Sequence, residues 1–211
     1  MAAPTPIRSK RSLFCKVCPG VDLWHPCFGR YPTENVTVIS PMSLQRTLRL
    51  MTRYRAWANQ LIFEAASRLP PEELTRPRTG PFKNIVHTLN HTYVIDQIFQ
   101  AHLLGRPHGF SARNTAEAPA LGDLWAAQRA IDDWYVSFSD AANESELEEV
   151  IRFVFVGGGD GAMKRGEMVL HVVNHTTYHR GYVADYFYQI PTHPPTTDLP
   201  VFLRDYRPEL D

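Results

Sequence analysis

Histidines recur every four residues near the end of the chain, at His171, His175 and His179. Apolar residues around them follow a helical period, and in an α-helix a step of four keeps side chains on one face. His175 and His179 can therefore bind one metal ion. His171 and His179 would lie about 12 Å apart along the axis, too far for two ligands that each sit about 2 Å from the metal. At least one further ligand must come from elsewhere in the chain.

Four amphipathic segments after residue 41 have the apolar spacing of helices. We expect helices over 44–69, 81–104, 121–138 and 166–189. The run 150–156 is rich in β-branched and aromatic residues and is followed by three glycines, which predicts a strand and a short hairpin with 162–164. The linker over 105–120 is long enough for a crossover or a lid. We therefore expect an all-α fold, a four-helix bundle with a small β-hairpin before the last helix, and such bundles build sites from facing helices.

Residues 1–41 differ in composition from the rest, with five basic residues, two acidic ones, several prolines and no helical period. We interpret them as a poorly ordered N-terminal extension of a metal-binding domain over 42–211. All three cysteines lie in this segment, so disulfides do not hold the main body together. Two alternatives stay open. The segment could form a structural zinc knuckle with the ligands Cys15, Cys18, His25 and Cys27. Alternatively, translation could start after the segment, at Met42.

The overall composition gives no reason to expect nucleic acid or a membrane as a partner. Formal net charge is zero, no apolar run approaches the roughly 20 residues of a membrane-spanning helix, and no secretory signal follows the basic N-terminal residues. We expect a cytoplasmic protein.

The predicted helix over 81–104 carries two further histidines. His91 faces the apolar side of that helix and His87 lies one turn earlier, so either could join the pair on the last helix. Three neutral imidazoles would leave one coordination position open, as in catalytic metal sites. Arg55 falls on the apolar stripe of the first helix, where we expect it to snorkel from the end of the bundle, with a substrate-binding role as the alternative.

The order of these motifs is similar to that of one known family. The matching pieces are Tyr54-x-x-Trp57-Ala58-Asn59, His87-Thr88-Leu89-Asn90-His91, Leu124-Trp125 and Asn174-His175-Thr176-Thr177-Tyr178-His179-Arg180-Gly181. From residue 42 onward the chain resembles the DinB/YfiT-like superfamily of metalloenzymes, which shares only its name with a DNA polymerase. The resemblance implies a four-helix bundle, often a homodimer, that holds one divalent metal ion with His91, His175 and His179.

The resemblance also implies a function. Some relatives are thiol-dependent transferases or isomerases, so we expect a metal-dependent transferase that uses a low-molecular-weight thiol and a small-molecule substrate. The alternatives are a metal-assisted hydrolase and a non-catalytic metal-binding stress-response protein.

Zinc or nickel is the expected ion, with iron, manganese or copper as further options. Ligating histidines usually donate their second N–H to a carbonyl or carboxylate, which makes Asp96 and Asn174 candidate partners. Metal affinity should fall below about pH 6, because the ligands must be neutral.

Overall fold

The structure, a computed structural model, describes residues 43–206 of the chain. Its described part contains seven helices and one two-stranded antiparallel sheet. In chain order these are α1 (Leu44–Ala66), α2 (Pro71–Thr75), α3 (Ile85–Leu103), α4 (Leu121–Ala141), α5 (Glu144–Leu147), β1 (Val150–Val154), β2 (Asp160–Lys164), α6 (Arg165–Tyr188) and α7 (Leu199–Asp205). The prediction of a mostly helical chain with a small hairpin before the last long helix is confirmed. The predicted extension and its zinc knuckle lie outside the described residues.

Capping residues set where two of the long helices begin. The Ser43 hydroxyl accepts a hydrogen bond from the backbone N–H of Arg46 at the start of α1. The Asn84 side chain accepts one from the backbone N–H of His87 at the start of α3. Such bonds satisfy N–H groups that have no partner inside the helix. Because Asn84 is the cap, α3 begins at Ile85, and the prediction of a start at Pro81 was wrong by about one turn.

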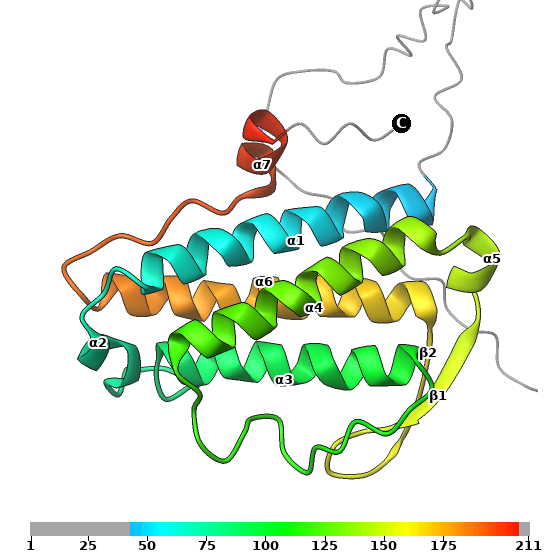
Figure 1. Cartoon of the computed structure of the whole chain (residues 1–211), viewed down its shortest axis with the longest axis horizontal. Helices are drawn as coiled ribbons and strands as arrows, with labels where there is room; N and C mark the ends of the chain where they lie inside the picture. Colours follow the sequence, from blue (N-terminus) through cyan, green and yellow to red (C-terminus); the bar gives the residue numbers. More distant parts are fainter. Residues whose placement is uncertain (1–42, 207–211) are drawn as a thin grey trace, which may run out of the picture. The chain divides into compact units, whose positions relative to one another are not determined.

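The four long helices pack along one another (Figure 1). α1 contacts α4 and α6, while α3 contacts α6 and α4. Apolar side chains fill the space between them in two clusters, one toward each end. The first includes Leu48, Ile98, Ile131 and Val172, and the second includes Phe63, Leu89, Leu124 and Phe187. Burying each such side chain contributes about 1.5–3 kcal/mol, so this packing dominates the stability of the fold.

The membership of these clusters gives the direction of each helix. The end of α3 and the end of α4 both pack in the first cluster, so these two consecutive helices run parallel. The connection over 104–120 therefore has to return along the length of α3 before α4 begins, as Figure 1 shows. This return path brings the middle of the connection beside the first turns of α3.

The hairpin leads directly into α6. β1 pairs with β2 in antiparallel register, with Ile151 opposite Met163 and Phe153 opposite Gly161. Its turn contains Gly157, Gly158 and Gly159, whose φ angles of 100°, 97° and 93° other residues rarely adopt. β2 ends at Lys164, and α6 starts at the next residue.

A charged cluster lies at the centre of the four helices. Arg55 is 1% exposed and forms ion pairs with Asp96 of α3 and, at 3.0 Å, with Asp132 of α4. Its Nε donates to the Thr176 hydroxyl of α6 at 3.2 Å, and the Gln128 amide donates to both carboxylates at 3.0 and 3.1 Å. The prediction that Arg55 snorkels to the end of the bundle was therefore wrong. Two carboxylates from other helices provide the partners that a buried guanidinium requires.

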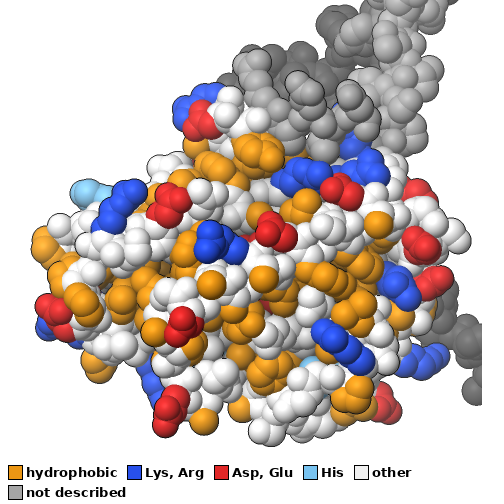
Figure 2. Space-filling model, viewed as in Figure 1, with side chains coloured by type: hydrophobic (Ala, Val, Ile, Leu, Met, Phe, Trp, Pro, Cys, Tyr) orange, Lys and Arg blue, Asp and Glu red, His pale blue; other side chains and the backbone are white. Residues whose placement is uncertain are grey.

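The face of the molecule in Figure 2 carries acidic and basic side chains interspersed with apolar ones. Over residues 43–206, no helix has the length and apolar character needed to cross a membrane.

Candidate metal centre

Three histidine side chains meet between α3 and α6. His91 comes from α3, whereas His175 and His179 lie one turn apart on α6. One ligand nitrogen of each residue lies within 4.8 Å of the other two. The ring centroids are 4.2 Å apart for the pair on α6, and His91 lies 5.1 Å from His175 and 4.6 Å from His179. The structure thus brings together the three side chains that were predicted as ligands.

Burial keeps these histidines in the form that binds metal. Desolvation, assisted by the neighbouring imidazoles, lowers the pKa of His175 to about 2 and that of His179 to about 4. Burial also lowers the pKa of His91. All three rings are therefore neutral near pH 7 and offer lone pairs, as a metal ligand must.

The polar atoms of this cluster also fit a cation. Within residues 43–206, the buried Nδ1 atoms of His175 and His179 have no hydrogen-bond partner. Buried polar atoms without partners are uncommon in folded proteins and call for an explanation. No carboxylate or second type of donor competes for the rings in the described cluster, which consists of imidazoles alone. Three convergent neutral imidazoles are a donor set suited to zinc, nickel, copper or iron.

A backbone carbonyl fixes the orientation of His91. Its Nδ1 lies 2.8 Å from the carbonyl oxygen of Arg113, in the connection between α3 and α4. Because a carbonyl oxygen only accepts hydrogen bonds, Nδ1 carries the proton and Nε2 keeps the lone pair. Such an outer hydrogen bond is the usual support of a metal-binding histidine. Sequence reasoning missed this partner, since a backbone carbonyl leaves no mark in the sequence.

The same connection is clamped to α3 beside His91. The Asn90 Oδ1 accepts hydrogen bonds at 3.0 Å from both the backbone N–H and the hydroxyl of Thr115, and one at 3.3 Å from Asn114. Asn114 also donates to the backbone carbonyl of His87 at 2.8 Å. Asn90 is the residue before His91 in the sequence motif, and this repeated Asn-His pattern was the available signal for its role.

Aromatic side chains form one wall of the site. The Phe82 ring lies 4.6 Å from the ring of His179 and 5.4 Å from that of His91, and its neighbour Tyr182 is 5.3 Å away. The hydroxyls of Tyr178 and Tyr182 are 2.7 Å apart in an exposed pair. The backbone of Phe82 is held by the Tyr186 hydroxyl, which donates to its carbonyl at 2.6 Å. Phe82 therefore shields the histidines from water on this side.

The remaining candidates from the sequence are not members of the three-histidine cluster, although the ring of His171 lies 5.5 Å from that of His175. Asp96 is fully buried in the Arg55 cluster, where burial raises its pKa to about 7 despite the opposing charge of Arg55. Asn174 is exposed on the surface of α6. Among residues 43–206, neither forms a hydrogen bond with the histidine rings. His171 packs against Phe99 with ring centroids 4.5 Å apart and lies outside the cluster.

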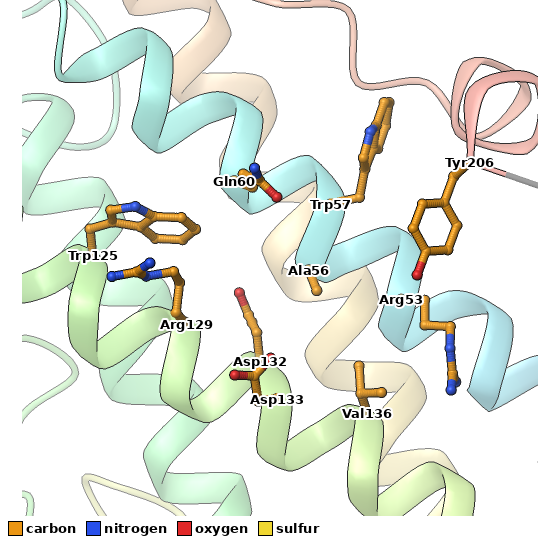
Figure 3. A pocket seen from close by; sticks show the side chains of 10 residues that line it. All are labelled: Arg53, Ala56, Trp57, Gln60, Trp125, Arg129, Asp132, Asp133, Val136 and Tyr206. Carbon is orange, nitrogen blue, oxygen red and sulfur yellow. The ribbon is translucent and has the colours of Figure 1, made fainter. Parts of the chain in front are cut away.

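A separate cavity of about 490 Å³ lies between α1 and α4 (Figure 3). Trp57 of α1 and Trp125 of α4 stand on opposite sides of it, and the Arg129 guanidinium lies against the Trp125 ring, 5.1 Å from the ring centroid. No histidine of the described part of the chain lines this cavity. It is therefore distinct from the candidate metal centre.

The fold and the site together define a mainly helical protein with a three-histidine cluster that could hold a metal ion. The family model of the DinB family matches residues 42–209, and the chain belongs to this family. It is also similar to "Protein DinB" of Bacillus subtilis (strain 168), with 27% identity over 161 residues that cover 71% of this chain and 90% of the relative. The resemblance seen in the sequence motifs is thereby confirmed.

Proposed function

We propose that this protein is a metal-dependent enzyme whose divalent cation is held by His91, His175 and His179 inside a four-helix bundle of α1, α3, α4 and α6. The observation that carries the proposal is the convergence of three neutral, largely buried imidazoles from two helices, with ligand atoms within 4.8 Å of one another. Structural zinc sites usually close with four protein ligands, whereas catalytic sites keep a position for water or substrate. In the described chain the cluster has three members, which favours the catalytic type.

The ion we propose is zinc or nickel, because both suit imidazole ligands; iron, copper and manganese are further options. When bound, such a cation lowers the pKa of a coordinated thiol or water and so supplies a nucleophile near neutral pH. The chain contributes the orientation of the ligands. The Arg113 carbonyl holds His91 with Nε2 unprotonated, and Phe82 excludes water from one side of the rings.

The reaction we propose is transfer of a low-molecular-weight thiol to a small electrophilic substrate, the activity that the motif resemblance suggests. A metal-assisted hydrolase would use the same open position with water. A protease of the His-Glu-x-x-His type is not supported, because Thr176 rather than Glu follows His175. The homodimer and the cytoplasmic location expected from the sequence stay predictions.

Loading and turnover assays test this function. The protein is loaded with zinc or nickel and assayed for conjugation of glutathione or cysteine to monochlorobimane, and separately for hydrolysis of p-nitrophenyl acetate. We expect thiol conjugation that disappears in His175→Ala and persists in His171→Ala, whose histidine lies outside the cluster. Ester hydrolysis without conjugation would favour the hydrolase. Absence of both activities, with a metal-dependent rise in melting temperature, would leave a non-catalytic metal-binding protein.

A further inference from the structure

A second cavity, of about 660 Å³, lies between the start of α3 and the connection over 104–120. Its α3 side includes His87 and Asn90, the residues one turn and one position before His91, whereas none of the three candidate metal ligands lines it. The connection closes its other side with residues from Gly109 to Ala118.

Asn90 lines this cavity and has unused hydrogen-bond donors. Its side chain is 2% exposed, and its Oδ1 is identified by the hydrogen bonds that it accepts from Thr115 and Asn114. The amide nitrogen Nδ2 consequently carries two N–H groups, and within the described chain it has no hydrogen-bond partner. Leaving a buried donor unsatisfied costs about 1–3 kcal/mol, so a ligand acceptor at this position would relieve a real penalty.

His87 adds a second unsatisfied group. Its Nδ1 is buried and lacks a partner among residues 43–206, although the residue as a whole is only partly buried. A neutral imidazole can donate from one ring nitrogen and accept at the other. His87 and Asn90 thus both line the cavity, and each has a buried nitrogen without a hydrogen-bond partner in the described chain.

The charge of the lining is positive. Among the described residues that line it, Lys83 is the one charged residue; it is exposed and forms no ion pair within the described chain. Between residues 43 and 206, no aspartate or glutamate lines the cavity. The cap residue of α3, Asn84, is part of the wall, so the positive end of a 19-residue helix lies beside it.

We propose that this cavity binds a small hydrophilic monocarboxylate, with Lys83 facing the carboxylate and with Asn90 and His87 hydrogen-bonded to its oxygens. One lysine with neutral donors balances a single negative charge. A phosphate dianion carries two negative charges, and this site has no second cation to balance them. The site does not require a metal ion and is independent of the proposed enzymatic function.

Calorimetric titration of metal-free His175→Ala protein with lactate tests the site, because no ion is then present to bind the carboxylate. We expect saturable binding of lactate and none of lactamide, its neutral analogue. Adding Lys83→Gln should weaken lactate binding about tenfold or more, since hydrogen bonds to charged groups are the stronger ones. The matched control is Lys164→Gln, which removes the charge of a partly exposed lysine at the end of β2, outside the cavity, and should leave lactate binding unchanged.

Asn90→Asp provides a second variant that keeps the clamp. The substitution retains an oxygen that can accept from Thr115 but replaces the two donors by a negative charge, so lactate binding should be lost while the circular dichroism spectrum is kept. Absence of lactate binding in the metal-free protein would overturn the proposal. So would equal binding of lactamide, equal or tighter binding of inorganic phosphate, or binding that needs metal and ignores Lys83→Gln.

Discussion

Replacing Arg55 by methionine would remove the guanidinium from the centre of the helices and leave two carboxyl groups without it. Arg55, Asp96 and Asp132 have side chains that are 1%, 0% and 3% exposed, so water cannot take its place. Burial already raises the pKa of both aspartates above the ordinary value, with the charge of Arg55 opposing that rise. Methionine keeps an unbranched chain, although a shorter one, and supplies neither charge nor hydrogen-bond donors.

The expected loss of stability is large. Removing one partner of a buried ion pair costs about 3–5 kcal/mol, because the other charge is left uncompensated. For a domain of this size, each kcal/mol lost from the free energy of unfolding lowers the melting temperature by about 2–4 °C. The melting temperature of the variant should therefore fall by about 10 °C. The pKa of Asp96, about 7 in the folded protein, should rise further in the variant. The folded variant then binds more protons than the unfolded chain. Its free energy of unfolding should therefore fall as pH rises from about 4 through 7 and beyond.

Urea unfolding followed by circular dichroism, at about pH 5 and about pH 8, measures both effects. The matched control is Arg46→Met, which changes an exposed arginine on the same helix and should stay within about 0.5 kcal/mol of the wild type. Converting Asp96 and Asp132 to asparagine in the Arg55→Met background should recover part of the loss at the higher pH. A cost below about 1 kcal/mol for Arg55→Met would refute the reasoning.

Three further predictions follow from other contacts. Tyr54→Phe removes the hydroxyl that accepts a 2.6 Å hydrogen bond from Arg180, and should cost about 1–3 kcal/mol in urea unfolding. Thr115→Val removes one of the hydrogen bonds to Asn90, and should speed proteolysis within the connection over 104–120. His175→Gln should reduce the loss of stability of metal-free protein between about pH 6.5 and 4, because burial lowers the folded pKa of His175 and the unfolded chain there binds more protons.

The long helices could be predicted because their apolar period extends over many turns. The short helices α2, α5 and α7 were not predicted, since five, four and seven residues are too few for a period to be recognised. α7 is instead held by tertiary packing: the Phe202 ring lies 5.4 Å from that of Trp57 and 5.8 Å from that of Tyr54.

The three histidines were predictable for a similar reason. His175 and His179 are related by helical spacing, and His91 belongs to a motif on the apolar face of its helix. What surrounds them was not predictable, because it depends on the path of the connection between α3 and α4. Arg55 shows the same limit: its position on an apolar stripe was visible, whereas its partners Asp96 and Asp132 lie on helices 41 and more residues away.

Metal stoichiometry and affinity, measured in wild type and three alanine variants, test the central claim most directly. We expect one equivalent of zinc or nickel per chain, and at least a hundredfold weaker binding in His91→Ala and in His179→Ala, since even outer partners of ligands contribute roughly 10–100-fold. His171→Ala should bind as the wild type does. Unchanged affinity in His91→Ala, or an equally large loss in His171→Ala, would contradict the three-histidine site.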